Sequence, residues 1–396
     1  MADWSYGVGD QATVKLYSHR LFAQTIQSTA AYKLSMVAPS RESPDNIVQI
    51  MDETQRTEGD TVKYDLIAKL QAPGVIGDNT LAGQEESLKT YQDQMTINQL
   101  RHAVLPYGAM SQQRVPFSMR DQAKMRLADW WAERLDVSLL NQLCGNTTGT
   151  FVQAVPYETK FTGLNPTVLP DVDHVMFANG RSCEVNANAA FANNGSTANP
   201  LVTGDVFTVD LIDNIVAIAH TSAMPLKPIR LKGMEVFGVL FLHPLQVKSL
   251  RKNFSQGQWG DIQLAAMNGG QITGNPIFTG AIGMYNNVVI HEDNHVPYSD
   301  SAAELTAAGQ VRYNSLSATA GVGTSVARGV FCSAQAACMA FGRAYGMDMK
   351  MRWFEELLDA GNQLRVTAGM ILGIKKTRFI SADYATITVS SFEANV

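Results

Sequence analysis

The stretch "PFSMRDQAKMRLADWWAERLDVSLLNQLCGN", residues 116–146, carries the longest helical pattern in the chain. Ser118 is a candidate N-cap, Asp121 lies in the first turn, and Gly145 is a candidate end. Apolar side chains recur at every fourth position along one stripe, namely Met119, Ala123, Leu127, Trp131, Leu135, Leu139 and Leu143. A helix of about 25 residues spans about 38 Å, which is long for a globular domain. We predict a structural spine at 118–143 whose Trp and Leu stripe is core rather than a binding site.

Upstream of this helix the pattern is that of a long β-hairpin. "TVKYDLIAKLQ" (61–71) alternates apolar and polar residues, and "QMTINQLRHAVL" (94–105) predicts its return strand. The segment between them is rich in Gly, Asn, Asp and Glu and cannot build a core. A ribbon of ten residues reaches roughly 33 Å and is marginally stable alone. Either it packs on its own domain, or it lies across a neighbouring subunit.

The residues after the spine predict a loose region followed by a helix. Residues 147–205 contain a cluster of Asn, Gly, Ser, Thr and Pro, which indicates an insertion. A helix is expected at 208–222, with Thr208 as its cap. The apolar run 236–242 indicates a buried strand that ends at His243–Pro244, because Pro244 suits the first turn of a following helix.

Strands dominate the expected C-terminal half. Residues 255–328 alternate short strands with Gly turns, and 329–343 is a strand or helix of small residues packed closely against other parts of the protein. Two long strands at 349–358 and 363–379 are joined by the turn "DAGN", and 385–392 forms a last strand. The first 45 residues show little periodicity and predict an arm, with a helix near 13–28.

Composition limits the classes of function. The 396 residues carry a net charge of −5, which argues against a chain built as a whole to coat nucleic acid. Four scattered cysteines make no disulfide framework, so a reducing compartment is expected. We expect no signal peptide, because the N-terminus lacks a basic and an apolar region. No apolar run is long enough for a membrane span.

The stretch "NNVVIHEDNHVPYSD" (286–300) contains the H-E-x-x-H spacing of zinc proteases. That chemistry needs a helix, so that both imidazoles share one face. The residues before His291 are β-branched, Asp293 is a poor helix former, and Pro297 stops any helix soon after His295. A strand running into a loop is the better interpretation, although a zinc metalloprotease stays as an alternative.

Other catalytic signatures are missing. The chain has no phosphate-binding loop of the G-x-x-x-x-G-K-[ST] type and no G-x-S-x-G elbow. The remaining histidines have no acidic or cysteine neighbours at ligand spacing, so each is expected to be structural. We therefore predict no enzyme, and no catalytic, metal-binding or cofactor-binding residue. Lys63 and Lys69 are given no chemical role.

Several stretches together resemble the major capsid proteins of tailed double-stranded-DNA bacteriophages, in particular the short-tailed large-genome branch. This capsid fold is shared with encapsulins and the herpesvirus capsid floor. The stretches that carry the likeness are "EGDTVKYDLIAKLQAPGVIGDNTLAGQEESL" (58–88), "ADWWAERLDVSLLNQLCG" (128–145), "VFGVLFLHPLQVKSLRKN" (236–253), "FCSAQAACMAFGR" (331–343) and "LLDAGNQLRVTAGMILGIKKTRF" (357–379).

The resemblance implies an α+β fold, the tailed-phage major capsid fold, divided into five regions. They are an N-terminal arm (1–56), an extended loop (57–110), a peripheral domain with the spine helix and a surface insertion at 147–205 (111–232), an axial domain (233–345) and closing strands of the peripheral domain (346–396). The loop would reach over an adjacent subunit and bend at glycine hinges. The hinge candidates are Gly59, Gly74, Gly77 and Gly83.

The implied function is a structural subunit that self-assembles into pentamers and hexamers of an icosahedral shell around the phage genome. Expected partners are other copies, a separate scaffolding protein, the portal protein at one vertex, a decoration protein, and packaged DNA bound without sequence specificity. No membrane is expected. The protein would be assembled in the bacterial cytoplasm and reside in the virion capsid. An encapsulin-like cargo shell and a phage tail or connector subunit remain alternatives.

Overall fold

The structure is a computed structural model. It describes residues 21–22, 24–25, 29, 46–51, 59–67, 70, 72, 74–77, 79–106, 108–146, 161–184, 199–202, 204–222, 226–231, 234–253, 281–299, 326–343 and 350–393. No helix within these ranges is both long and apolar enough to cross a membrane.

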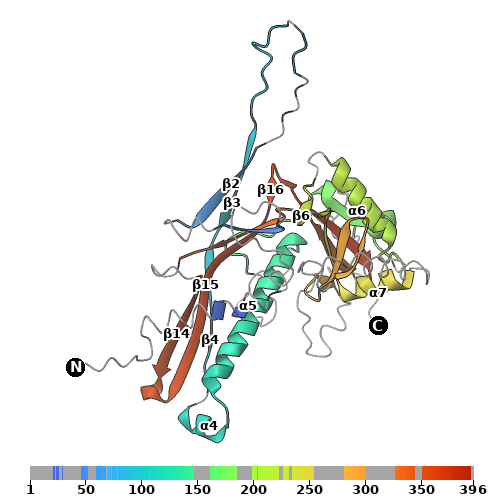
Figure 1. The fold of residues 1–396 in the computed structure, drawn as a ribbon. Coiled ribbons are helices and arrows are strands. Elements are labelled where there is room, and N and C mark those ends of the chain that lie inside the picture. Colours follow the sequence, from blue (N-terminus) through green and yellow to red (C-terminus); the bar gives the residue numbers. More distant parts are fainter. Residues whose placement is uncertain are drawn as a thin grey trace.

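The spine helix is confirmed as α5 (Met119–Leu143), which spans 25 residues (Figure 1). The hydroxyl oxygen of Ser118 accepts a hydrogen bond from the backbone N–H of Asp121 at 3.3 Å, as an N-cap does. The predicted stripe is buried from Ala123 onward, whereas Met119 is only partly covered. Beyond the helix Gly145 adopts a φ of +63°, and a Cβ there would lie 2.5 Å from Pro170. Only glycine fits this position, which explains why the helix ends here. A short helix, α4 (Ala109–Arg114), precedes α5 at its far end.

A five-stranded sheet lies against α5. Its central strand is β15 (Gln363–Lys376), and the others are β1 (Val48–Met51), β13 (Ala337–Phe341), β14 (Met351–Leu358) and β4 (Asn98–Val104). Alternate β15 side chains enter the core beneath α5, because successive residues of a strand point to opposite faces. These side chains are Val366, Ala368, Met370, Leu372 and Ile374.

The single return strand expected at 94–105 is corrected to two strands, β3 and β4. β2 (Thr61–Ile67) pairs with β3 (Thr90–Thr96), and the chain then enters the main sheet as β4. Asn165 explains the break. Its side chain accepts from the N–H of Thr96 and donates to the carbonyl of Thr96, each at 2.8 Å. Both backbone groups of that residue are thus taken, and the ribbon ends there.

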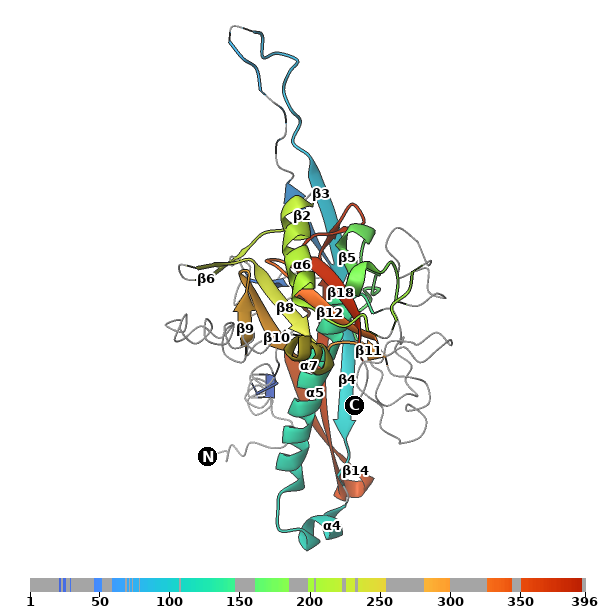
Figure 2. The same cartoon turned by 90° about the vertical axis from the view of Figure 1, so that its right-hand side faces the viewer.

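A seven-stranded sheet forms the second part of the molecule, covered by the helices α6 (Val209–Thr221) and α7 (Pro244–Asn253) (Figure 2). Its strands are β5 (Val175–Phe177), β18 (Thr386–Phe392), β12 (Val326–Cys332), β8 (Gly238–Leu242), β10 (Val288–Glu292), β9 (Ala281–Tyr285) and β11 (Tyr298–Ser299). Leu240 and Leu242 of β8 belong to the core beneath the helices, whereas Val239 and Phe241 belong to the core of the spine helix. The two parts therefore share this sheet.

The strand partners cross the region boundaries that the sequence suggested. β18 was expected among the closing strands beside β14 and β15, but it pairs with β12 and β5 in the seven-stranded sheet. β13 was expected in the axial region, but it pairs with β15 and, in parallel, with β1 from the expected arm. The reason is that strand partners are chosen by long-range packing, which local periodicity does not record.

The region expected as a surface insertion, 147–205, is packed into the fold over the part that the structure describes, and its status as an insertion stays a prediction. β5 lies in the seven-stranded sheet, and Phe161 is buried in the core of the spine helix. Arg328 binds Glu184 through two hydrogen bonds of 2.9 and 2.6 Å, and the same arginine donates to the carbonyl of Gly145. Residues 161–184 thus join the helix end to both sheets. Residues 147–160, 185–198 and 203 lie outside the described residues.

Most other local expectations are confirmed. The helix at 208–222 is α6, and Pro244 opens α7. The small-residue stretch at 329–343 belongs to two buried strands, β12 and β13, rather than to a helix. The turn "DAGN" joins β14 to β15. Four residues of the expected N-terminal helix are described as helical, 21–22 and 24–25, and the rest of it lies outside the described residues. Two-stranded pairs complete the fold, β6 (Ile229–Leu231) with β7 (Met234–Val236), and β16 (Arg378–Phe379) with β17 (Ala382–Asp383).

Candidate assembly surfaces

The H-E-x-x-H stretch does not have the geometry of a zinc protease. His291 and Glu292 lie on strand β10, where successive side chains point to opposite faces. His291 is buried and stacks on Phe241, with ring centroids 6.0 Å apart, whereas Glu292 is exposed. His295 follows in a turn. The two imidazoles therefore do not share a helix face, and the expectation of a strand running into a loop is confirmed.

His295 has a local partner instead. Its Nδ1 lies 2.9 Å from an Asp293 carboxylate oxygen, and this hydrogen bond raises the pKa of His295. Across the described residues, no group of three or more His, Cys, Asp or Glu side chains is placed to hold a metal ion. The part of the chain that the structure describes thus offers no candidate metal centre.

The loop that joins β2 to β3, called here the loop 68–89, projects from the body over its described residues (Figure 1). Pairing of the two strands stops at Ile67 and Thr90. Beyond that point four large apolar side chains are exposed, and Ile76 reaches 84% exposure. They are Leu70, Ile76, Leu81 and Leu88. Apolar side chains gathered on one projecting segment are typical of a surface that another protein covers.

Glycines shape this projecting loop. Three of the expected hinge positions, Gly74, Gly77 and Gly83, lie in the loop, and Gly59 precedes β2. All four have positive φ, and a Cβ at any of them would meet nothing within 4 Å. Glycine is therefore needed for backbone conformation and not for space. The limbs of the loop are also tied together, since the N–H of Ala72 donates to Glu86 at 2.7 Å. Whether the glycines act as hinges stays a prediction. Lys63 is exposed on β2, and Lys69 lies outside the described residues.

The root of the loop is fixed to the body by Asp93 of β3. Its carboxylate accepts a hydrogen bond from the hydroxyl of Tyr64 at 2.6 Å and binds the ammonium of Lys375 on β15. Burial and the neighbouring negative charge of Asp93 raise the pKa of the Tyr64 phenol. Met95 and Val62, on the same ribbon, are buried in the core. The loop thus has a rigid base and an exposed end.

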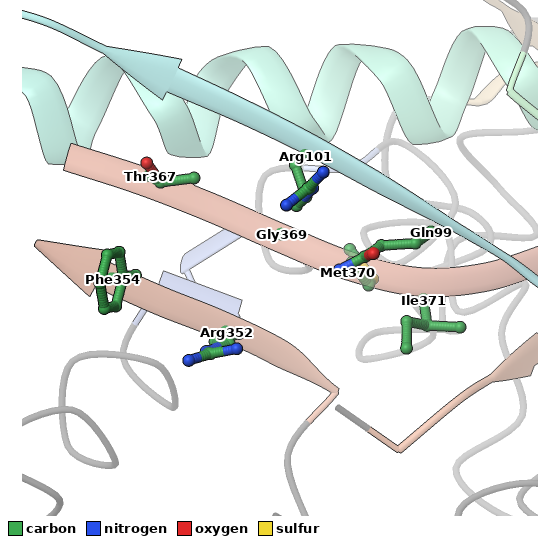
Figure 3. A pocket seen from close by; sticks show the side chains of 8 residues that line it. All are labelled: Gln99, Arg101, Arg352, Phe354, Thr367, Gly369, Met370 and Ile371. Atoms are coloured by element: carbon green, nitrogen blue, oxygen red, sulfur yellow. The ribbon is translucent and has the colours of Figure 1, made fainter. Parts of the chain in front are cut away.

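A second surface lies on the face of the five-stranded sheet that points away from α5 (Figure 3). Arg101 of β4 and Arg352 of β14 are the two cross-strand partners of Gly369 on β15, and the stem of Arg101 lies over the glycine, where an added Cβ would be 3.0 Å from its Cγ. The guanidinium of Arg352 lies 5.6 Å from the ring centre of Phe354, which is 42% exposed. The resulting groove encloses about 190 Å³. It is lined by Gln99, Arg101, Arg352, Phe354, Thr367, Gly369, Met370 and Ile371.

Buried ionisable groups elsewhere are structural. Lys376 binds Asp383 at 2.7 Å inside the protein, and burial lowers the pKa of this lysine while Asp383 opposes the shift. Burial raises the pKa of Glu393 to about 7, although hydrogen bonds from Ser249 and from the N–H of Phe207 oppose it. Both groups are buried and hydrogen-bonded within the protein, which is typical of a role in packing.

Comparison with known proteins identifies the family of this chain. The sequence model of a family described as phage capsid protein matches residues 5–394. This chain belongs to the phage capsid protein family. The major capsid protein of Pseudomonas phage KPP25 is 28% identical over 348 residues, which is 85% of this chain and 83% of that protein.

Solved capsids share the fold. The capsid of Ralstonia phage GP4 superposes with a TM-score of 0.73 at 26% identity, over 100% of this chain and 96% of that one. The capsid asymmetric unit of Cyanophage Pam1 gives a TM-score of 0.62 at 16% identity, over 91% of this chain and 92% of that one, which is a likeness of fold alone. The expected tailed-phage capsid fold is confirmed.

The phage capsid protein described here is therefore a structural subunit, of which many copies form the shell of the virion. Family membership also removes the tail or connector alternative. The sequence pattern indicated the loop but not its root at Asp93 or the groove at Gly369. Asp93 and Lys375 are 282 positions apart, and no local pattern joins them. A weak signal for the groove existed, because glycines interrupt the apolar pattern of β15.

Proposed function

We propose that this capsid protein closes into pentamers and hexamers of an icosahedral shell around a double-stranded DNA phage genome. The observation that carries the proposal is the projecting loop 68–89, with its fixed root and its exposed apolar end. Burying one large apolar side chain stabilises an interface by about 1.5–3 kcal/mol. Four such side chains per copy, repeated over a shell, make contacts that are weak singly and strong in sum.

The regions of the chain take different parts in this proposal. The five-stranded sheet with α5 acts as the peripheral domain, and the seven-stranded sheet with α6 and α7 acts as the axial domain around the symmetry axes. The loop reaches over an adjacent subunit and adjusts at its glycines. The same contact can then close in both five-fold and six-fold rings, which differ in the angle between neighbours.

The partners are proposed on the same basis. A separate scaffolding protein guides assembly in the bacterial cytoplasm, the portal protein occupies one vertex, and a decoration protein binds the outer surface. Packaged DNA contacts the inner face without sequence specificity, and the chain catalyses no reaction. An encapsulin-like cargo shell would use the same fold, but the family and the relatives are those of phages, which favours a genome over a protein cargo.

Deleting residues 72–90 tests the role of the loop. The structure refines the ends of this deletion, because β3 begins at Thr90. Replacing 70–88 by a short Gly-Ser turn should leave β2 and β3 paired and the body folded, since no core residue is removed. We expect an unchanged urea unfolding midpoint and no closed shells by electron microscopy.

A matched variant separates the apolar side chains from the length of the loop. Leu70→Ser, Ile76→Ser, Leu81→Ser and Leu88→Ser together keep every glycine and both limbs. This variant should also fail to close shells, because burial of these side chains drives the contact. Normal shells from the loop replacement would disprove the proposed role of the loop.

A further inference from the structure

The hairpin of β16 and β17 ends in a turn that its own sequence does not favour. The two strands pair through to Phe379 opposite Ala382, which leaves only Ile380 and Ser381 to reverse the chain. Both residues have positive φ, 52° for Ile380 and 64° for Ser381, as a two-residue type I′ turn requires. Asn-Gly is the usual sequence of such a turn, because a β-branched side chain is strained at positive φ.

The base of this hairpin is held by buried aromatic rings. Phe379 is buried, and its ring meets the rings of Tyr64 and Tyr384 edge-on, with centroids 6.1 and 5.5 Å apart. The guanidinium of Arg378 donates a hydrogen bond to the carbonyl of Ser381 inside the turn. These contacts keep the turn in its strained conformation.

Ile380 is strained and exposed at once. Its side chain is 65% exposed, whereas that of Phe379 beside it is 4% exposed. In the isolated subunit the isoleucine thus strains the turn and leaves apolar surface in water, and both effects are unfavourable. An asparagine would avoid both. Strain that the folding of the subunit does not require is typical of functional positions, where a rigid side chain is held ready for a partner.

The hairpin lies beside the root of the projecting loop (Figure 1). The backbone N–H of Arg378 donates to the carboxylate of Asp93 at 3.4 Å, and the same carboxylate accepts from Tyr64 of β2. The turn at 380–381 is therefore fixed relative to the strands from which the loop leaves the body. A surface that covers the start of the loop continues onto Ile380.

We propose that Ile380 is an anchor residue between copies, covered in the shell by an apolar surface of the neighbouring copy that lies against the root of the loop. One side chain offers too little area to hold a separate protein. A contact that every copy repeats beside another contact instead adds to a shared interface, so a second copy is the partner that fits. The inference rests on the proposed function of the loop only for its place in that interface.

Three substitutions separate the strain of the turn from the contact. Ile380→Asn suits a type I′ turn and removes the apolar side chain. We expect the urea unfolding midpoint of the subunit to rise, and the critical concentration for shell assembly to rise about tenfold or more. Ile380→Met keeps an apolar, unbranched side chain and should assemble as the unchanged protein does. Ser381→Gly is the matched control, because it relieves the same turn and should raise the midpoint without changing assembly.

A photoreactive side chain identifies the partner. Ile380 is replaced by an aliphatic amino acid that carries a diazirine, and empty shells are irradiated. We expect covalent dimers of this chain from the shells and none from dilute free subunits, with the crosslink joining position 380 to an apolar surface of the second copy. Mass spectrometry of the crosslinked peptides then locates that surface.

Three outcomes would overturn the inference. Ile380→Asn could assemble at the concentration of the unchanged protein, Ile380→Met could fail as the asparagine variant does, or the diazirine could crosslink only to a protein other than this chain. A lower unfolding midpoint for Ile380→Asn would also overturn it, because the side chain would then support the subunit itself. If Ile380→Asn assembles normally while the loop replacement still abolishes shells, the anchor is disproved and the proposed function stands.

Discussion

Two antiparallel ribbons extend from opposite ends of this capsid protein, and they end differently (Figure 1). In the β14–β15 ribbon, pairing continues from Met351 opposite Met370 to Leu358 opposite Gln363, and the tight turn at 359–361 closes it. In the β2–β3 ribbon, pairing ends at Ile67 opposite Thr90, and the described residues between them (70, 72, 74–77 and 79–89) belong to no strand. We call them the closed ribbon and the open ribbon.

The two ribbons differ in how much of each is buried in the core. The closed ribbon buries one face, including Trp353, in the core of the spine helix. The open ribbon buries only its root, and the apolar side chains of its loop stay in solvent. Hydrogen bonds of a complete ladder keep the shape of one ribbon, whereas the other depends on a partner surface to cover its loop.

The largest expected effect compares adjacent residues of the closed ribbon. Trp353 is 2% exposed and Phe354 is 42% exposed, on opposite faces of β14. Trp353→Ala removes a buried aromatic ring and should lower the free energy of unfolding by about 3–5 kcal/mol. Phe354→Ala should lower it by less than about 1 kcal/mol. Urea unfolding measures both, and equal losses would show that the closed ribbon is not anchored by its inner face.

A smaller effect is expected at the root of the open ribbon. Asp93→Ala removes the acceptor of Tyr64 and the partner of Lys375, which should cost about 1–3 kcal/mol. Asp65→Ala is the matched control, because Asp65 is exposed on the same ribbon. Amide hydrogen exchange should accelerate in β2 and β3 and stay slow in β14 and β15. Equal acceleration of hydrogen exchange in all four strands would mean that the open ribbon does not unfold separately from the sheet.

The smallest expected effect comes from replacing one glycine by alanine at the end of each ribbon. Gly361 in the tight turn and Gly74 in the loop have φ of +89° and +76°, and neither has a neighbour within 4 Å of an added Cβ. Gly361→Ala should cost about 1 kcal/mol of unfolding free energy, because the strained turn folds with the ladder. Gly74→Ala should leave the unfolding midpoint unchanged, because the loop can relax without the body. A large loss from Gly74→Ala would show that the loop is coupled to the core.

Helices and strands were predictable where the residues that determine them are close together in the sequence. Ser118, the four-residue apolar step and Gly145 define α5 within one continuous stretch. The alternation of β14 and β15 and the turn between them are local as well. The strand at His291 was also predictable, because the residues before it are β-branched. Two histidines on a strand and a following turn cannot share one helix face, as a zinc protease requires.

The sequence by itself therefore determined the spine helix, the closed ribbon, the apolar loop and, through family likeness, the role in a capsid. Only the tertiary structure decided that β18 joins the seven-stranded sheet, that β1 pairs with β13, and that residues 161–184 belong to the cores. It also decided that Arg101 and Arg352 meet across Gly369. The physical reason is that periodicity reports which face of an element is buried, while the partner of that face is selected by packing between residues hundreds of positions apart.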